Sequence, residues 1–228
     1  MKHTILFLAA NPAGTDRLAL DREAHDIQAE LERSGHRDRF EFVTRWAVEP
    51  LDLLRELRKL RPTIVHFSGH GGSTSVASRR GELRRDIVAA DPAAIGDRPD
   101  ARTGLYFQGP DGRPQLVSAA ALEATFGAAG SSVQLVVLNA CYSEPQAQAL
   151  LAHVDCVVGM SGSILDDAAR VFAVGFYGGL GERESVEAAC KQGRAAIHLA
   201  GLRDHDRPQL AVRRGVDARR LVLAADPR

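Results

Sequence analysis

The sequence predicts an α/β fold in which a mostly parallel β-sheet is covered by helices on both faces. Two observations lead to this prediction. Strand-like apolar runs alternate with helical stretches along the chain. Most of these runs are continuously apolar, which is typical of parallel strands buried on both faces. We therefore expect a central sheet between two layers of helices.

The individual elements follow in order. A strand over residues 3–9 leads through a polar turn into a helix over about 19–33, in which Leu20, Ile27 and Leu31 approximate one face. A helix that begins at Pro50 repeats leucine every three residues and ends at Arg61-Pro62. The other predicted strands are 40–46, 63–67, 133–138, 155–159 and 209–212; the other predicted helices are 118–126, 147–153, 166–180 and 183–200; a last apolar stretch covers 220–224.

Length, composition and charge limit the possible classes of protein. The 228 residues, 45% of them hydrophobic, are enough to bury a substantial core, and we expect one domain over 1–228. Basic and acidic residues both number 29, so no net charge favours nucleic acid. No apolar run approaches the roughly 20 residues that cross a bilayer. We therefore expect a cytoplasmic protein that binds neither membrane nor nucleic acid.

Metal and disulfide chemistry are not indicated. The three cysteines are an odd number, are widely spaced and form no CxxC motif. The histidines show no metal-ligand spacing such as HExxH. We expect free thiols, no metal and no cofactor.

Two strand ends carry groups that could act together. TIVHFSGHGG ends one apolar strand at His70, and LVVLNACYS ends another at Cys141. The carboxyl ends of parallel strands form the ligand crevice of an open α/β sheet, so the two side chains would meet if these strands are neighbours. The imidazole would hold the thiol near its thiolate form and then protonate a departing amine. The amides of Gly71 and Cys141 would stabilise the oxyanion, and Gly71 would let a substrate backbone approach.

Other chemically able residues have simpler interpretations. His66 lies inside a strand, where a hydrogen-bonded core histidine is expected. Cys156 and Cys190 are expected to be small buried hydrophobes. Asn139 is placed to orient the cysteine turn, and Asn11 opens a turn before Pro12.

Segments along most of the chain resemble one protein family. They are ILFLAANP, LDREAHDI, TRWAVEP, IVHFSGHG, GLYFQGPDG, VVLNACYSE, VVGMSGSI and AVGFYGGLG, and in this order they resemble the CHAT domain of the caspase-like cysteine peptidases. The resemblance implies a caspase-like three-layer α/β/α sandwich. It also implies peptide-bond hydrolysis by a Cys-His dyad on Cys141 and His70, with a role as a bacterial effector or signalling protease.

The resemblance places substrate selection after the strand that follows the cysteine. There the sequence reads GMSGSILDDAAR, and a carboxylate of Asp166 or Asp167 would pair with a basic side chain preceding the cut. Asp166 is the favoured candidate. An equally open interpretation is that one of the two caps the following helix.

The segment over 72–103 departs from the family pattern. It is about twice the roughly 12–15 residues beyond which structureless loops become uncommon in compact domains, so it is either a mobile functional loop or an excursion with a short helix of its own. The family usually has a short connection there. The pairs Arg79-Arg80 and Arg84-Arg85 suggest an autoprocessing or gating element, and a solvated charged loop is the alternative. No sensor module is recognisable, so besides a protein substrate we expect an activating partner in trans, unless the domain is active alone.

Two rival functions remain to be distinguished. A nucleotide- or NAD-binding module would need GxGxxG or GxxxxGK[ST], and neither motif occurs in the sequence. A catalytically latent or inactive caspase-like interaction module is compatible with the fold, although both His70 and Cys141 are present.

Overall fold

A computed structural model describes residues 2–75 and 101–224 of the chain. Its main strands are β1 (His3–Ala10), β2 (Phe40–Trp46), β3 (Ile64–Gly69), β7 (Leu135–Asn139), β8 (Cys156–Met160) and β9 (Pro208–Val212). They form a six-stranded sheet in the order β2-β1-β3-β7-β8-β9. All neighbouring pairs are parallel except β8 and β9, which are antiparallel. The predicted mostly parallel sheet is therefore confirmed.

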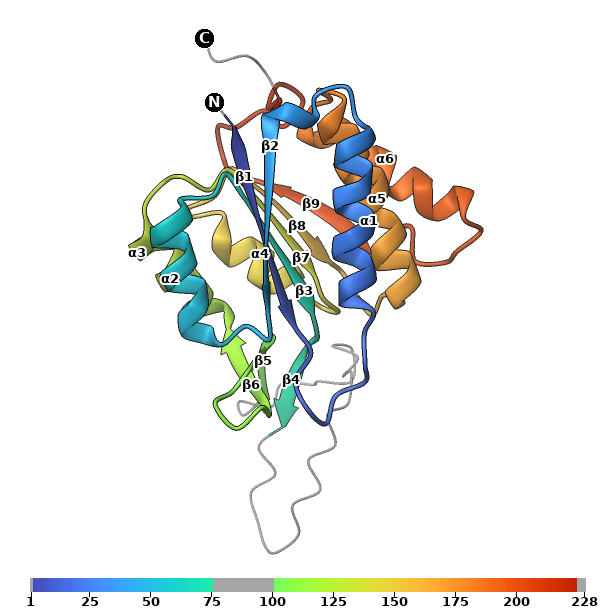
Figure 1. Cartoon of the computed structure of the whole chain (residues 1–228). Helices are drawn as coiled ribbons and strands as arrows, with labels where there is room; N and C mark the ends of the chain where they lie inside the picture. Colours follow the sequence, from blue (N-terminus) through green and yellow to red (C-terminus); the bar gives the residue numbers. More distant parts are fainter. Residues whose placement is uncertain (1, 76–100, 225–228) are drawn as a thin grey trace, which may run out of the picture.

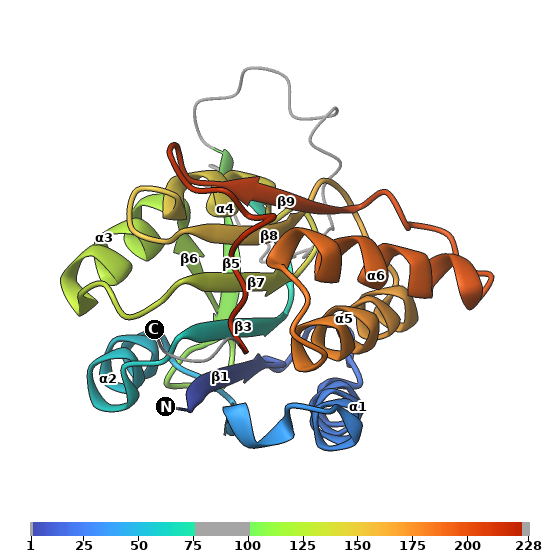
Figure 2. The same cartoon turned by 90° about the horizontal axis from the view of Figure 1, so that it is seen from above.

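Helices cover both faces of this sheet (Figures 1 and 2). One layer contains α1 (Leu20–Arg33), α5 (Asp166–Gly181) and α6 (Val186–Leu199), and the other contains α2 (Pro50–Leu60), α3 (Ala119–Ala129) and α4 (Glu144–Leu150). A short 3-10 turn, Arg37–Arg39 (η1), precedes β2. None of the helices in the described ranges is long and apolar enough to cross a membrane.

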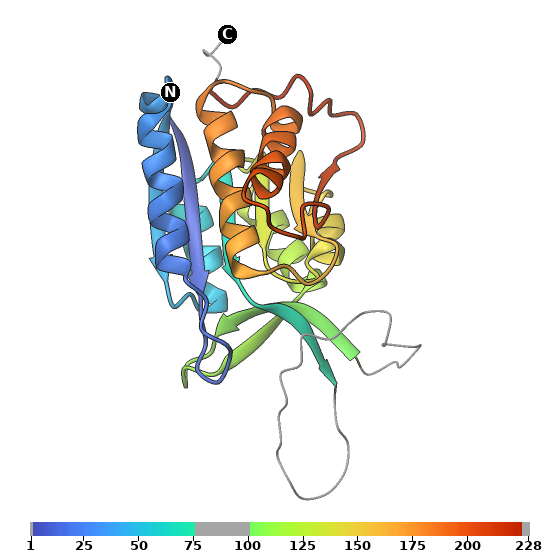
Figure 3. The ribbon, with the colours of Figure 1, turned by 90° about the vertical axis from the view of Figure 1, so that its right-hand side faces the viewer.

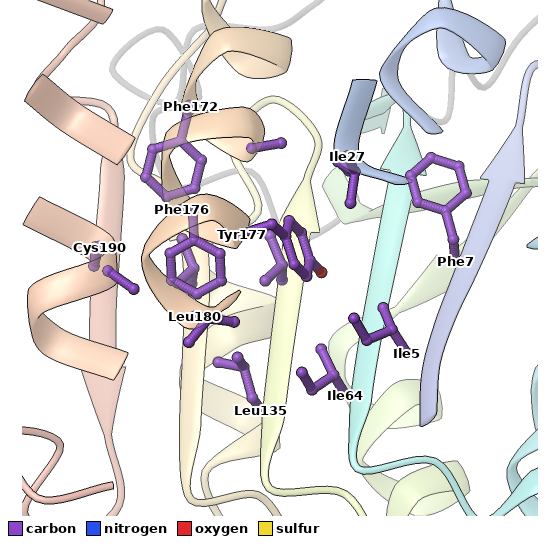
Figure 4. Close-up of a cluster of buried hydrophobic side chains, with 14 of the residues drawn as sticks. Ile5, Phe7, Ile27, Ile64, Leu135, Phe172, Phe176, Tyr177, Leu180 and Cys190 are labelled. Atoms are coloured by element: carbon purple, nitrogen blue, oxygen red, sulfur yellow. The ribbon is translucent and has the colours of Figure 1, made fainter. Parts of the chain in front are cut away.

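The core consists of two layers because successive side chains of a strand point to opposite faces. In β1, Ile5 and Phe7 pack against the layer of α1, α5 and α6, while Leu6 and Leu8 pack against the layer of α2, α3 and α4. This is why the strand reads as continuously apolar. Figure 4 shows the first layer, where Ile27 of α1 and four residues of α5 cover the strands: Phe172, Phe176, Tyr177 and Leu180.

A second, smaller sheet lies beyond the carboxyl ends of β1 and β3 (Figures 1 and 3). Its strands are β4 (Gly71–Ser75), β5 (Ala101–Gln108) and β6 (Pro114–Ser118), paired antiparallel in the order β4-β5-β6. The two ends of the predicted inserted loop over 72–103 are therefore strands, with residues 72–75 in β4 and 101–103 in β5. β4 reads GGSTS and has no apolar pattern, so only its pairing with β5 makes it a strand. Residues 76–100, which include the arginine pairs, lie outside the described residues.

The helices follow the sequence pattern with two differences. In α2, Leu53 and Leu57 are buried and Leu51 is 61% exposed, because a strict three-residue spacing rotates around a helix while residues four apart share a face. The helix predicted over 147–153 begins earlier, at Glu144, with Pro145 in its first turn, where proline is favoured. Ser118 caps α3, since its hydroxyl accepts a hydrogen bond from the Ala121 amide at 3.3 Å.

Candidate functional site

The ends of β3 and β7 bring His70 and Cys141 to the same edge of the sheet. The two strands are direct neighbours, and Ser68 is the register partner of Asn139. His70 and Cys141 each follow two residues later. A Cβ atom placed on Gly71 would lie only 2.1 Å from the Cys141 carbonyl oxygen. The two backbones are therefore in contact at this point, as the sequence predicts for neighbouring strands.

A hydrogen bond to the backbone orients the His70 imidazole. Its Nε2 lies 2.7 Å from the carbonyl oxygen of Asp16, in the loop between β1 and α1. A carbonyl can only accept, so Nε2 carries the proton and Nδ1 is the basic nitrogen of the neutral ring. The carbonyl thus supplies the orienting contact that a third catalytic residue often provides. The sequence carries no signal for it, because a backbone carbonyl is present at every residue.

The half-buried Cys141 thiol lies against the segment that follows β8. Its Sγ accepts from the Ile164 amide at 3.5 Å and lies 3.7 Å from both the Ile164 carbonyl oxygen and the Ser163 hydroxyl. The next residue, Tyr142, has a φ of 55° and donates its amide proton to Gly162 at 3.0 Å. Such a left-handed conformation costs a non-glycine residue free energy, so residues 162–164 hold the cysteine turn in a strained, defined position.

The other two cysteines differ from Cys141 in burial. Burial raises the pKa of Cys156 to about 12 and also raises the pKa of Cys190. Both side chains are packed in the core, as predicted. They are inert thiols, which leaves Cys141 as the accessible one.

Gly71 also has a structural task. Its Cα packs against the Cys141 carbonyl group, which leaves no room for a side chain at this position. Gly71 also begins β4, where it pairs with Leu105. The glycine therefore joins the small sheet to the cysteine turn.

Asp166 and Asp167 lie in the first turn of α5, two and three residues beyond Ile164. Neither is the N-cap, which is Leu165. Asp166 Oδ2 accepts a hydrogen bond from the Ala19 amide at 3.1 Å, which ties the start of α5 to the start of α1. Asp167 is 70% exposed in its side chain and pairs with Arg170 at 3.2 Å. Of the two, Asp166 is the one directed toward the loop that contacts His70.

Arg207 adds a cation to the same region, and sequence reasoning missed it. A Cβ on Gly162 would lie 2.7 Å from Arg207 Nη1, and the Arg207 carbonyl accepts from the Ser161 amide at 2.9 Å. Within the described part of the chain, its buried Nε has no hydrogen-bond partner. Positive and negative side chains therefore both flank the segment that contacts Cys141.

An open cavity of about 300 Å³ lies at the same edge, beyond β1 and β2. Trp46, which is 50% exposed, forms one wall, and Arg17 and Leu18 of the loop that contacts His70 form another. Asn11, predicted as a turn residue, lines this cavity too and donates to the Leu18 carbonyl at 3.2 Å. Within residues 2–75 and 101–224, no group of three or more His, Cys, Asp or Glu is placed to hold a metal ion.

A buried polar cluster lies next to the site, near the ends of β3 and β7, and its centre is Glu23 of α1. The carboxylate accepts hydrogen bonds from Asn139 Nδ2 at 2.6 Å, from His66 Nε2 at 3.0 Å and from the Ser68 hydroxyl. His66 Nδ1 lies 3.1 Å from the Tyr177 hydroxyl. His66 is thus the hydrogen-bonded core histidine that the sequence predicts, but its acidic partner was missed.

The buried carboxylate of Glu23 is expected to make the protein less stable at acidic pH. Burial raises the pKa of Glu23, but the hydrogen bonds that its carboxylate accepts from His66, Ser68 and Asn139 outweigh burial, so the pKa lies below its ordinary value of 4.5. A depressed pKa contributes stability that is present above 4.5 and lost as the pH falls through the folded-state value. We expect the free energy of unfolding, measured in urea, to fall more steeply below pH 4.5 in the wild type than in Glu23→Gln. Equal slopes would contradict the assignment.

Comparisons with known proteins agree with this architecture. The model of the CHAT domain family matches residues 3–210, and no curated protein matches the chain. The Drosophila initiator caspase Dronc has a similar structure, with a TM-score of 0.55 at 8% identity over 97% of this chain and 83% of that chain. A secreted C11 cysteine protease from Bacteroides thetaiotaomicron, iotapain, matches with a TM-score of 0.42 at 12% identity over 72% of this chain and 54% of its own. The family match and the similarity to Dronc confirm the expected caspase-like α/β fold.

Proposed function

Since the chain belongs to the CHAT domain family, we propose that it is a cysteine peptidase in which Cys141 is the nucleophile and His70 the general base and acid. One observation carries the proposal. His70 and Cys141 each lie two residues beyond Ser68 and Asn139, which are register partners in the adjacent parallel strands β3 and β7. In addition, Gly71 is in contact with the Cys141 carbonyl. This is the arrangement in which one imidazole can serve one thiol.

The proposed reaction uses the proton arrangement of His70. With Nε2–H bound to the Asp16 carbonyl, Nδ1 takes the thiol proton as Sγ attacks the peptide carbonyl carbon. The imidazolium then protonates the leaving amine, and a thioester remains on Cys141. Water deprotonated by Nδ1 hydrolyses the thioester. The amides of Gly71 and Cys141 are the proposed donors to the tetrahedral oxyanion.

An active-site-directed label tests this function. A peptide carrying an electrophile for cysteine peptidases should modify wild-type Cys141 and leave Cys141→Ser unmodified. Peptide mapping identifies the labelled residue. A folded wild-type protein that takes up no label would favour the alternative, an inactive caspase-like interaction module.

We further propose that Asp166 selects a basic side chain on the residue before the cut. Its carboxylate follows the segment that contacts Cys141 by two residues, and a charge-assisted pair with Arg or Lys would be favourable there. In a peptide library, Asp166→Ala is expected to lose cleavage after Arg and Lys selectively, while the neighbouring Asp167→Ala keeps the wild-type preference.

The same peptide library distinguishes Asp166 from Arg207 as the residue that selects the substrate side chain. A uniform loss for all peptides in Asp166→Ala would show that the carboxylate acts only through its bond to Ala19. Cleavage after acidic residues, abolished in Arg207→Ala, would instead assign selection to Arg207, whose guanidinium covers Gly162.

A further inference from the structure

The buried polar residues Glu23, His66, Ser68, Asn139 and Tyr177 form what we call the Glu23 cluster. We propose that Glu23 is a positioning residue that holds the ends of β3 and β7 in the register that the Cys141–His70 pair requires. The inference rests on the proposed peptidase function and deepens it, because it assigns the geometry of the pair to a residue on a third element, α1.

The contacts of Glu23 span the two strands that carry the pair. Its Oε1 accepts from Asn139 of β7 at 2.6 Å, and its Oε2 accepts from the Ser68 hydroxyl of β3. Ser68 and Asn139 are direct register partners and form the last rung before the strands end. One carboxylate therefore ties both strands together two residues before His70 and Cys141.

The hydrogen bonds of the cluster have one consistent direction. Asn139 Nδ2 and the Ser68 hydroxyl donate to Glu23, and so does His66 Nε2–H. The remaining His66 nitrogen, Nδ1, then accepts from the Tyr177 hydroxyl of α5, which points toward the strands in Figure 4. The ionised carboxylate thus receives three donors, and the imidazole between Glu23 and Tyr177 is held in one tautomer and one orientation.

Stability alone does not account for this cluster. Glu23 is 3% exposed and His66 is fully buried, and well-packed apolar residues of the same volume are often as stabilising as a buried ionised group with its partners. What apolar residues cannot supply is direction, because their packing determines which side chains face the core but makes no oriented bond between the two strand ends. The bonds that one carboxylate accepts from Ser68 and Asn139 do supply it, at the register pair nearest to the proposed nucleophile and base.

Glu23 also links the strands to the loop that orients His70. Helix α1, which carries Glu23, begins directly after the loop whose Asp16 carbonyl binds His70 Nε2. The Ala19 amide at the end of that loop is held by Asp166 of α5, and Asn139 donates a second bond to the Ala169 carbonyl of α5 at 3.2 Å. A shift of α1 would therefore displace His70 relative to Cys141 by two routes: through the strand ends that Glu23 binds, and through the loop whose Asp16 carbonyl binds the imidazole.

Two substitutions of graded severity test the inference. Glu23→Gln keeps the shape and allows the Ser68 hydroxyl to reverse, so the bridge survives with weaker, neutral hydrogen bonds, and kcat is expected to fall about tenfold. Glu23→Met keeps the volume but removes every acceptor, and kcat is expected to fall by about 10²-fold, as for a misplacement of about 1 Å. KM should stay close to the wild-type value. Glu32→Gln, on the exposed side of the same helix, is the matched control and should match the wild type.

A second readout does not depend on any peptide substrate. The rate at which iodoacetamide alkylates Cys141 is measured against pH, with peptide mapping to separate it from the buried Cys156 and Cys190. If His70 supports the thiolate, His70→Ala changes this pH profile, and Glu23→Met should change it in the same direction. Glu23→Gln should lie between Glu23→Met and the wild type.

The outcomes separate the inference from the function. If the folded Glu23 variants have wild-type kcat and a wild-type alkylation profile while His70→Ala differs, the positioning role is refuted and the peptidase proposal stands. A lower thermal midpoint with full activity in the folded fraction also refutes it, because Glu23 would then act on stability alone. If His70→Ala itself leaves the alkylation profile unchanged, the proposed dyad fails and the inference fails with it.

Discussion

With Cys141 replaced by alanine, the protein is expected to lose peptide-bond cleavage by about 10³-fold or more in kcat/KM while it keeps its fold. The proposed reaction has no other nucleophile, because burial raises the pKa of both Cys156 and Cys190 and keeps their thiols protonated. The fold should tolerate the change, since the hydrogen bonds of Sγ to Ile164 and Ser163 are long, at 3.5–3.7 Å, and alanine keeps the Cβ atom that packs on the core. Cleavage of a fluorogenic peptide and circular dichroism measure the two effects.

His70→Ala is the companion variant for this prediction. Its loss should be similar, because two residues that act as one unit do not contribute additively. Substantial cleavage in a folded Cys141→Ala protein would exclude the proposed nucleophile. Full activity in His70→Ala would exclude the proposed base and leave Cys141 to be activated in another way.

Gly71→Ala is expected to have the largest effect on structure and activity together. The added methyl group would lie 2.1 Å from the Cys141 carbonyl oxygen, well inside the roughly 3.5 Å of an ordinary contact. The obstacle is backbone, so either β4 or the cysteine turn has to move. We expect a loss of about 1–3 kcal/mol in the free energy of unfolding and of about 10²-fold in kcat/KM, measured by urea unfolding and peptide cleavage.

Gly35→Ala is a matched control for Gly71→Ala. Its added methyl group would meet only the carboxylate of Glu182 at 3.1 Å, at the end of a flexible side chain that can move. Stability and activity should therefore stay near the wild-type values. Wild-type behaviour of Gly71→Ala would mean that the small sheet and the cysteine turn are not held against each other as described.

The central strands of the main sheet could be predicted because their burial on both faces leaves a strong pattern. β1 is apolar at nearly every position, and its odd and even residues fill different layers of the core. The same reasoning predicted that His70 and Cys141 follow strand ends. It could not predict β4, because GGSTS has no apolar side chain and becomes a strand only through backbone pairing with β5.

The contacts around the site were less predictable for a different reason. Helical spacing puts Glu23 on the buried face of α1, three residues after Leu20 and four before Ile27. Its partners could not be predicted, because His66 lies 43 residues away in the chain and Asn139 lies 116 away. Arg207 approaches Gly162 from the segment before β9, and the Asp16 carbonyl is a backbone group. None of these contacts follows from local periodicity.

The sequence by itself determined the class of fold, the order of the main strands and helices, and the two residues best suited to thiol chemistry, because periodicity and strand ends are local properties of the chain. Only the tertiary structure decided which groups surround those two residues. Packing of α1 and α5 on the sheet puts Glu23 and Tyr177 beneath the strand ends, and the loop before α1 puts the Asp16 carbonyl on His70. These partners meet only after the chain has folded, since the interactions that place them are long-range and directional.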